Sequence, residues 1–229
     1  MSSHLVNPKL MEKQILVDLY GVGGTGCHVL SGLYRIDRGL RACQHEHGLR
    51  AMVYDPDRVS HANLGRQPFH VSDVGDYKAK TLVERNNMYS RSRFGYQNRK
   101  NPGKTDADII ISCVDSGKSR ESISKINAKK GAYVIDCGND KNFGNVFLGQ
   151  FDGKLPLPYE EEPDLLRDTN PNEPSCSEAD ALGEQDMFVN QAVATVALQL
   201  VWSMLRHQRI TVRGAFINLN TLTTNPINI

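Results

Sequence analysis

The stretch ILVDLYGVGGTGCHVLSGLYRI, residues 15–36, decides the fold. It opens with a short apolar and β-branched run that is typical of a buried strand, and its second half carries apolar residues at helical spacing. A glycine-rich turn at 21–26 separates the two, and the helix is expected to open near Thr25. The order strand, glycine turn, helix predicts the first unit of a parallel α/β sheet.

The following segments continue this alternation as far as residue 140. The run Ile109-Ile110-Ile111 is continuously apolar, which favours a strand covered on both faces. The alternation predicts a Rossmann-like α/β fold, with a doubly wound, mostly parallel sheet and helices on both faces. Ligands of such sheets bind beyond the carboxyl ends of the strands. Strands are expected within 50–57, 106–116 and 132–140, and helices within 77–89 and 117–131.

The second half of the chain changes character. A strand is expected at 145–153, and the acidic, proline-containing stretch 153–185 predicts a long mobile loop. Residues 186–206 predict a helix that is apolar on more than one side, which must be buried under the sheet or against another subunit. The alternation within 210–229 predicts one or two terminal strands, antiparallel at the sheet edge. We expect one domain over 1–229.

Composition narrows the class of protein. The chain has 229 residues, of which 39% are hydrophobic and 23% charged, and its net charge of +1 gives no reason to expect nucleic-acid binding. Its five cysteines form no C-x-x-C pair, so neither a disulfide framework nor a structural zinc site is expected. Cys43, His45 and His47 form a weaker candidate metal group. Without a signal sequence or a long apolar span, a cytoplasmic location is expected and a membrane is not.

The glycine turn indicates phosphate binding. Glycines let the backbone approach a phosphate, and the helix that follows offers unpaired N–H groups and a favourable dipole. The alternative is a turn that serves only to pack the strand against the helix. The motif does not distinguish NAD, FAD and ATP. Its candidate residues are Gly21, Gly23, Gly24, Thr25 and Gly26.

The stretch YDPDRVSHANLGRQPF, residues 54–69, argues for a triphosphate. Asp55 stands where a carboxylate can accept from both ribose hydroxyls, although it could instead cap the next turn. Asp57 is equally plausible as a nucleotide ligand and as a turn former. The planar fork of Arg66 and the point charge of Lys78 would neutralise phosphate charge that a dinucleotide does not carry. Asn63 and Gln67 complete this group, and each charge taken singly could be a solvated surface residue.

Two further residues are candidates for chemistry. Asp115 follows a buried strand at the same sheet edge and could hold a magnesium ion, because hard cations take carboxylate oxygens and substrate phosphates. Cys176 lies in a polar segment before the long helix, where it could be a nucleophile or an incidental thiol. Cys113 and Cys137 are expected in the core, and Cys27 is expected to pack inward.

In their order and spacing, these motifs resemble the adenylation superfamily of the ubiquitin-activating E1 enzymes, MoeB and ThiF. The segments VDLYGVGGTG, NLGRQ and CSEADALGEQD are most similar to the ThiF family protein of the PRTRC gene systems. The resemblance implies that Asp55 binds the ATP ribose, that Asn63, Arg66 and Lys78 surround the phosphates, and that Asp115 binds Mg²⁺. It also implies attack of a protein's C-terminal carboxylate on the α-phosphate of ATP, which leaves an acyl adenylate.

The resemblance implies a small ubiquitin-like or sulfur-carrier protein as the partner, and a homodimer. Superfamily members commonly supply an N-terminal arginine to the ATP of the partner subunit, but no arginine precedes Arg35 here, and Lys9 or Lys13 would have to substitute. Cys176 is the one candidate for thioester transfer. Two alternatives remain: a catalytically silent nucleotide-binding module that recruits a partner, and, more weakly, an NAD- or FAD-linked oxidoreductase.

Overall fold

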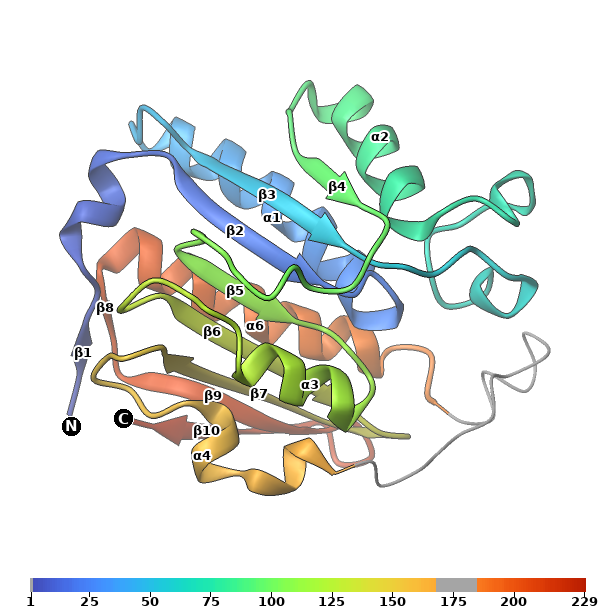
Figure 1. Cartoon of the computed structure of the whole chain (residues 1–229). Helices are drawn as coiled ribbons and strands as arrows, with labels where there is room; N and C mark the ends of the chain where they lie inside the picture. The colour runs from blue at the N-terminus through green and yellow to red at the C-terminus, as the bar shows by residue number, and fades with distance from the viewer. Residues whose placement is uncertain (1, 168–184) are drawn as a thin grey trace.

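An eight-stranded sheet forms the middle layer of the protein (Figure 1). The computed structural model describes residues 2–167 and 185–229. Five neighbouring strands run parallel and the remaining three antiparallel, so the predicted mostly parallel α/β sheet is confirmed. The strand order is β10 (Thr223–Asn228), β9 (Val212–Asn218), β7 (Phe143–Gln150), β6 (Tyr133–Asn139), β5 (Ile109–Ser112), β2 (Ile15–Tyr20), β3 (Leu49–Tyr54) and β4 (Gly95–Gln97).

Helices cover both faces of the sheet, as predicted. The helices α1 (Gly24–Ala42), α2 (Lys78–Ser90) and α6 (Val189–His207) lie on one face. The short helices α3 (Gly117–Ser124) and α4 (Pro158–Glu161) lie on the other. Among the described helices, none combines the length and the apolar character that crossing a membrane requires.

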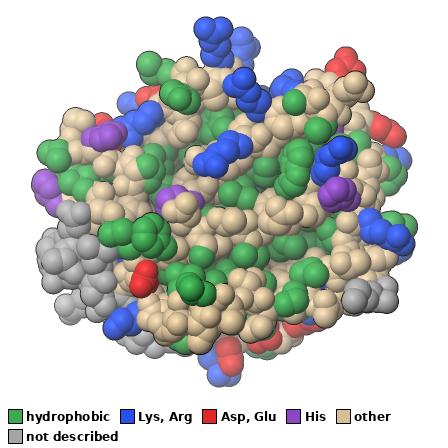
Figure 2. Space-filling view, turned by 180° about the vertical axis from the view of Figure 1, so that it is seen from behind, with side chains coloured by type: hydrophobic (Ala, Val, Ile, Leu, Met, Phe, Trp, Pro, Cys, Tyr) green, Lys and Arg blue, Asp and Glu red, His purple; other side chains and the backbone are tan. Residues whose placement is uncertain are grey.

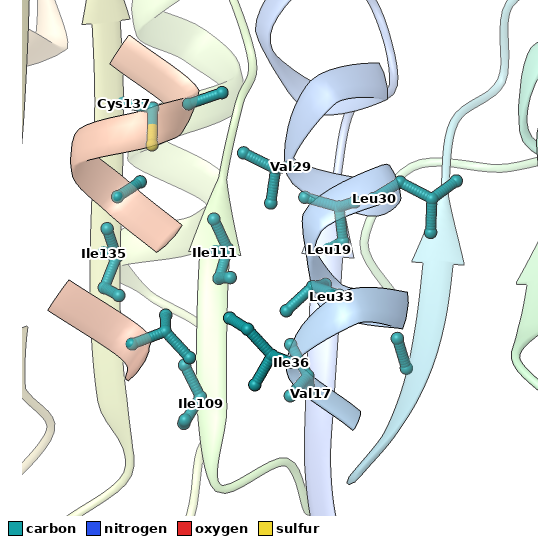
Figure 3. Packing of buried hydrophobic residues seen from close by; sticks show 14 of the residues in the cluster. Val17, Leu19, Val29, Leu30, Leu33, Ile36, Ile109, Ile111, Ile135 and Cys137 are labelled. Atoms are coloured by element: carbon teal, nitrogen blue, oxygen red, sulfur yellow. The ribbon is translucent and has the colours of Figure 1, made fainter. Parts of the chain in front are cut away.

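The larger core lies between the sheet and α1 with α6. Val17 and Leu19 of β2 and Ile111 of β5 point toward Val29 and Leu33 of α1 (Figure 3). All of these side chains are buried, and each contributes roughly 1.5–3 kcal/mol relative to an exposed position. The stretch 15–36 thus builds both the strand and the helix that form the centre of the core.

Helix α6 is buried under the sheet, which was one of the two places expected for it. Val193, Ala197 and Val201 are fully enclosed, and the helix packs on α1 and on β6, β7 and β9. Gly32 of α1 leaves the space that the Leu198 side chain occupies. The two helices therefore approach closely at this point.

The helix predicted over 117–131 is wrong in its second half, because α3 ends at Ser124. Residues 125–131 instead pair with the loop before β5: the Asn127 N–H donates to the Gly103 carbonyl and its carbonyl accepts from the Thr105 N–H. These bonds replace the helical ladder and let Ile126 reach the second, smaller core.

The described part of the stretch 153–185 contains helical turns that a featureless loop would lack. Proline opens both α4 and the 3-10 turn η4 (Pro163–Leu166), because its fixed φ suits a first helical position. Tyr159 of α4 is buried against the sheet. Sequence patterns missed the shortest elements, which are β1 (His4–Leu5), β8 (Arg209–Ile210), β4 and the 3-10 turns η1 (Pro8–Glu12), η2 (His61–Asn63) and η3 (Val71–Asp73).

Candidate functional site

The carboxyl ends of the parallel strands meet at one edge of the sheet, at the right of Figure 1. The glycine turn follows β2, and Asp55 follows β3 directly. Asp115 comes three positions after the end of β5, and Asn139 ends β6. The topology therefore gathers residues from four separate stretches of the sequence at this edge.

The glycines of the turn have two different roles. Gly21 has a φ of +82°, and a Cβ there would lie 2.7 Å from the Cys113 carbonyl oxygen, so packing requires a glycine. A Cβ at Gly26 would collide with the carbonyl of Gly21. At Gly23, by contrast, a Cβ would meet no atom within 4 Å. Packing accounts for Gly21 and Gly26, and Gly23 borders open space where a phosphate could approach the backbone.

Asp55 fastens the turn to β3. One carboxylate oxygen accepts from the Val22 N–H at 2.7 Å and the other from the Asp57 N–H at 2.8 Å. Burial raises the pKa of Asp55, while the two amide donors and Lys78 oppose that rise. Each carboxylate oxygen has a further lone pair, so this structural role leaves capacity to accept from ribose hydroxyls.

Asp57 and Lys78 form an ion pair beside Asp55. Lys78 Nζ lies 3.2 Å from Asp57 Oδ2, and the Lys78 N–H donates to the Asp57 carbonyl at 3.0 Å. The Lys78 side chain is 10% exposed, whereas that of Asp57 is 62% exposed. The ammonium group of Lys78 is thereby held near the strand end at the first residue of α2.

A line of hydrogen bonds joins Arg66 to the start of α1. Arg66 Nη1 donates to Gln185 Oε1 at 2.9 Å, and Asn190 Nδ2 donates to the same oxygen at 3.2 Å. Asn190 Oδ1 in turn accepts from Thr25 Oγ1 at 2.9 Å, and Thr25 Oγ1 also lies 3.3 Å from Asn139 Oδ1. The arginine segment and the glycine turn, 41 positions apart between Thr25 and Arg66, are therefore bridged by two side chains.

Two buried polar atoms of this segment have no hydrogen-bond partner in the part of the chain that the structure describes. They are Arg66 Nε, a donor, and Gln67 Oε1, an acceptor. Burial lowers the pKa of Arg66. Leaving a buried polar group unpaired costs about 1–3 kcal/mol, so both atoms are suited to a polar ligand.

Asn63 has a local role. Its carboxamide oxygen accepts from the backbone N–H and the hydroxyl of Ser60, at 2.9 and 3.2 Å. Its carbonyl accepts from the Gln67 N–H at 3.0 Å. Asn63 thus shapes the 3-10 turn η2 that carries the chain toward Arg66.

Asp115 is exposed, and its side chain makes no hydrogen bond or ion pair with another described residue. Over residues 2–167 and 185–229, no group of three His, Cys, Asp or Glu side chains is arranged to hold a metal ion. His45, of the weaker metal group, accepts from the Gly48 N–H and belongs to a turn. This arrangement would suit a magnesium ion that has the Asp115 carboxylate as its one protein ligand of this kind and substrate phosphates as further ligands.

Among the described cysteines, Cys27 and Cys137 are buried, Cys113 is only partly buried although it was expected in the core, and Cys43 is exposed. The burial of Cys27 and Cys137 is as expected, and burial raises the pKa of Cys27 to about 12. A hydrogen bond with Cys137, together with burial, raises the pKa of Cys113. The raised pKa values keep Cys27 and Cys113 in the thiol form at neutral pH, so neither is suited to be a thiolate nucleophile. Cys176 lies outside the described residues.

Sequence reasoning missed three amide side chains that form hydrogen bonds between segments of the site: Gln185, Asn190 and Asn139. Asn190 is 3% exposed at the start of a helix whose other enclosed residues are apolar. A polar residue at such a position was the available signal, because buried amides need partners.

The chain has recognisable relatives. A model of the ThiF family matches residues 7–228. The chain is similar to the adenylyltransferase and sulfurtransferase UBA4 of Eremothecium gossypii, with 30% identity over 157 residues, which cover 65% of this chain and 32% of that protein. It spans about a third of the length of this curated relative.

Solved structures share the fold at low identity. The crystal structure of PaaA has a TM-score of 0.64 at 15% identity and covers 96% of this chain and 65% of that chain. The crystal structure of E. coli MccB has a TM-score of 0.61 at 18% identity, with coverages of 96% and 64%. A structure of E. coli MccB with ATP has a TM-score of 0.60 at 18% identity, with coverages of 96% and 66%.

Proposed function

We propose that this chain, which belongs to the ThiF family, is an ATP-dependent adenylyltransferase that activates the C-terminal carboxylate of a small ubiquitin-like or sulfur-carrier protein. One observation carries the proposal: the hydrogen-bonded line from Arg66 through Gln185 and Asn190 to Thr25. It holds a planar cationic fork in fixed relation to the start of α1. The pyrophosphate of a dinucleotide carries less negative charge, whereas the triphosphate of ATP carries more, which a held guanidinium group would neutralise.

The remaining residues fit a nucleotide. Asp55 would accept from the ribose hydroxyls with the lone pairs that the Val22 and Asp57 amides leave free. The open space beside Gly23 would admit the phosphates. The unpaired Arg66 Nε would donate to a phosphate oxygen, and Lys78 would add a second positive charge.

In the proposed reaction, a carboxylate oxygen of the carrier attacks the α-phosphorus of ATP. The bond from that phosphorus to the oxygen bridging to the β-phosphate breaks, and pyrophosphate leaves with the electron pair. No side-chain base is required, because a C-terminal carboxylate is already ionised at neutral pH. Arg66 and Lys78 would stabilise charge on the departing phosphates.

Magnesium would neutralise part of the phosphate charge when bound, and Asp115 is the residue that we propose to hold it. Its exposed carboxylate, which no other described residue binds, can take this role without breaking an existing contact. We further propose that the Cys176 thiolate attacks the acyl carbon of the adenylate, which releases AMP and leaves a thioester on the enzyme.

A silent nucleotide-binding module is the second candidate, and one observation favours it. Lys13, one of the two lysines that could replace the N-terminal arginine of the superfamily, the other being Lys9, is bound to Asp108 with an Nζ–Oδ1 distance of 2.7 Å. That pair would have to open before Lys13 could reach the nucleotide of a second subunit. The adenylation proposal includes the expectation that the enzyme acts as a homodimer.

ATP–pyrophosphate exchange with candidate carrier proteins tests the adenylation proposal. We expect exchange that depends on the carrier and is abolished in Asp115→Ala, with Asp106→Ala as the matched control. Asp106 is also exposed but precedes β5 at the opposite sheet edge. Tight ATP binding without exchange would favour the silent module. Thermal stabilisation by NAD in preference to MgATP would contradict both.

A further inference from the structure

A cavity lies at the opposite edge of the sheet from the glycine turn. It has a volume of about 460 Å³ and is lined by the carboxyl-terminal half of α1, the start of β3 and the segment after α2. Its nearest lining residue on α1, Tyr34, lies ten positions after Gly24, the first residue of that helix, which is about 15 Å along the helix axis at the usual rise per residue. It is therefore separate from the candidate nucleotide site.

Arginine dominates the lining of this cavity. Five arginines and one acid, Asp37, border it, and all five arginines are exposed to solvent. Basic side chains also gather toward the upper edge of the helical face in Figure 2. The arginines are Arg38 and Arg41 of α1, Arg50 of β3, and Arg91 and Arg93 of the segment after α2.

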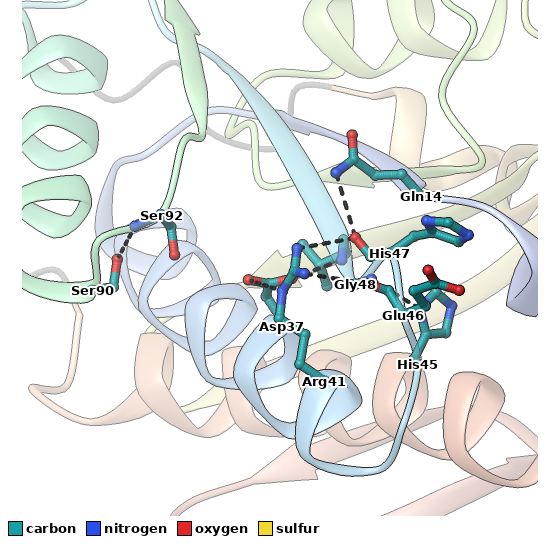
Figure 4. Close-up of polar contacts among 10 residues, drawn as sticks. Gln14, Asp37, Arg41, His45, Glu46, His47, Gly48, Ser90 and Ser92 are labelled. Carbon is teal, nitrogen blue, oxygen red and sulfur yellow. Dashed lines mark hydrogen bonds and ion pairs between the residues drawn. The ribbon is translucent and has the colours of Figure 1, made fainter.

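The single acid is already neutralised. Asp37 Oδ1 lies 3.2 Å from Arg41 Nε and accepts from the Leu49 N–H at 2.8 Å. Arg41 also donates to the carbonyls of Glu46 and His47, as Figure 4 shows. These contacts hold Arg41 and Asp37 together at one wall, and the positive charge of Arg41 balances the negative charge of Asp37, so the other four arginines are not compensated by it.

The other four arginines have no anionic partner among residues 2–167 and 185–229. The side chains of these four, Arg38, Arg50, Arg91 and Arg93, make no hydrogen bond or ion pair with another residue of that part of the chain. They come from three different elements, so chain neighbourhood alone does not explain why they converge. Ser90 and Ser92, the chain neighbours of Arg91, also line the cavity (Figure 4), and the Ser90 hydroxyl donates to the Asn86 carbonyl at 2.6 Å.

Two buried, stacked rings border the cavity. Tyr34 of α1 stacks on Phe94 with ring centroids 4.0 Å apart, and both rings are buried. Asn87 of α2 accepts from the Tyr34 hydroxyl at 2.8 Å and exchanges hydrogen bonds with the backbone of Phe94. This contact set holds the backbone of the segment that carries Arg91 and Arg93 against α1, so the two arginines start from fixed backbone positions at the cavity.

From this arrangement we propose that the cavity binds a ligand through a phosphate group, as a phosphomonoester. A phosphate offers three oxygens to several guanidinium forks at once, whereas one carboxylate offers two, and four free arginines exceed what a carboxylate can use. The volume is in the range of small-molecule pockets. The chain's net charge of +1 argues against an extended nucleic-acid surface.

Titration calorimetry at low salt, with inorganic phosphate, glucose 6-phosphate and a phosphoserine peptide as probes, tests the site. We expect saturable binding of at least one phosphomonoester that weakens at least ten-fold in the double variant Arg91→Gln, Arg93→Gln. Arg206→Gln, at an exposed arginine in the last turn of α6, is the matched control and should bind like the wild type. Preference for glucose 6-phosphate indicates a metabolite, and preference for the peptide a phosphorylated protein.

A third variant separates this site from the nucleotide site. Lys78→Gln should leave phosphomonoester binding at the cavity unchanged, because Lys78 begins α2 at the other edge of the sheet. Loss of binding in Lys78→Gln with retention in the double arginine variant would overturn the proposal. So would the absence of saturable binding, or equal binding of an unphosphorylated glutamate peptide. The readout does not depend on adenylation, so the two proposals can fail separately.

Discussion

Arg66 Nη1 lies 2.9 Å from Gln185 Oε1, although the two residues are 119 positions apart in the chain. The contact joins the loop after β3 to the segment that leads into α6. Because Gln185 also accepts from Asn190, the position of the guanidinium depends on the start of α6 as well as on its own loop. The geometry of the candidate phosphate site is therefore a property of the tertiary structure.

Arg66→Gln should lower kcat/KM for carrier-dependent exchange by roughly 100-fold, because the guanidinium group would no longer donate to the negative charge that develops on the phosphates in the transition state. The free energy of unfolding should change by less than about 1 kcal/mol, since Arg66 has one described side-chain partner. Exchange kinetics and urea unfolding on the same samples measure both quantities. Arg206→Gln is the control for loss of a charge, and an unchanged kcat/KM in Arg66→Gln would contradict the assignment.

Substitutions at Gly21 and Gly23 should separate packing from binding. Gly21→Ala places a Cβ 2.7 Å from the Cys113 carbonyl at a φ of +82°, so we expect a loss of at least about 2 kcal/mol of stability. Gly23→Ala meets no protein atom within 4 Å and should weaken ATP binding with a smaller loss of stability. Thermal unfolding with and without MgATP distinguishes the two. Equal effects of both changes would mean that the turn serves packing alone.

Asp108 should contribute stability that depends on pH. Burial alone would raise its pKa, but the Leu16 N–H, Lys129 and Lys13 outweigh burial and hold the pKa below the usual 3.8. The folded state therefore favours the charged form. The stabilisation is present above about pH 4 and is lost as the pH falls through the lowered pKa.

Asp108→Asn should cost about 2 kcal/mol at pH 7, which is less than the roughly 3–5 kcal/mol for breaking a fully buried ion pair, because both lysines are partly exposed. Urea unfolding between pH 3 and pH 7 measures the effect. The difference between the variant and the wild type should shrink as the solution becomes acidic. A difference that stays constant with pH would show that the carboxylate charge is not the cause.

Tyr159→Phe should loosen α4. The Tyr159 hydroxyl donates to Asp136 Oδ1 at 3.0 Å, and Asp136 is fully buried with Arg120 Nε 3.2 Å from its other oxygen. Removing the donor leaves part of a buried carboxylate unpaired, at a cost of about 1–3 kcal/mol. Hydrogen exchange over residues 158–166 should become faster. Tyr89→Phe, at a side chain that is 94% exposed, is the control and should change neither exchange nor stability.

Cys176→Ala should abolish a thiol-sensitive conjugate with the carrier while ATP–pyrophosphate exchange continues, because the adenylate forms before the thioester. Non-reducing gel electrophoresis after incubation with carrier and MgATP detects the conjugate. Cys43→Ala is the control, since Cys43 is exposed but lies after α1, away from the nucleotide edge. Conjugates that persist in Cys176→Ala would rule out the nucleophile.

Much of the sheet could be predicted because its signals are local. The apolar run at 109–111 and the glycine turn at 21–26 act through their nearest neighbours in the chain, so their strand and turn are where the sequence indicates. The helix predicted to Gly131 is the counterexample. Its later residues have helical composition, yet Asn127 bonds to Gly103 and Thr105, and that distant pairing ends the helix.

By itself, the sequence determined the parallel α/β fold and the residues that end its strands, because the spacing of apolar residues and glycines sets the backbone locally. Only the tertiary structure decided which of those residues act together. The link from Arg66 to Thr25 runs through Gln185 and Asn190, and the arginine cavity joins α1, β3 and the segment after α2. Both depend on side chains brought close by packing between distant segments, which local sequence patterns do not record.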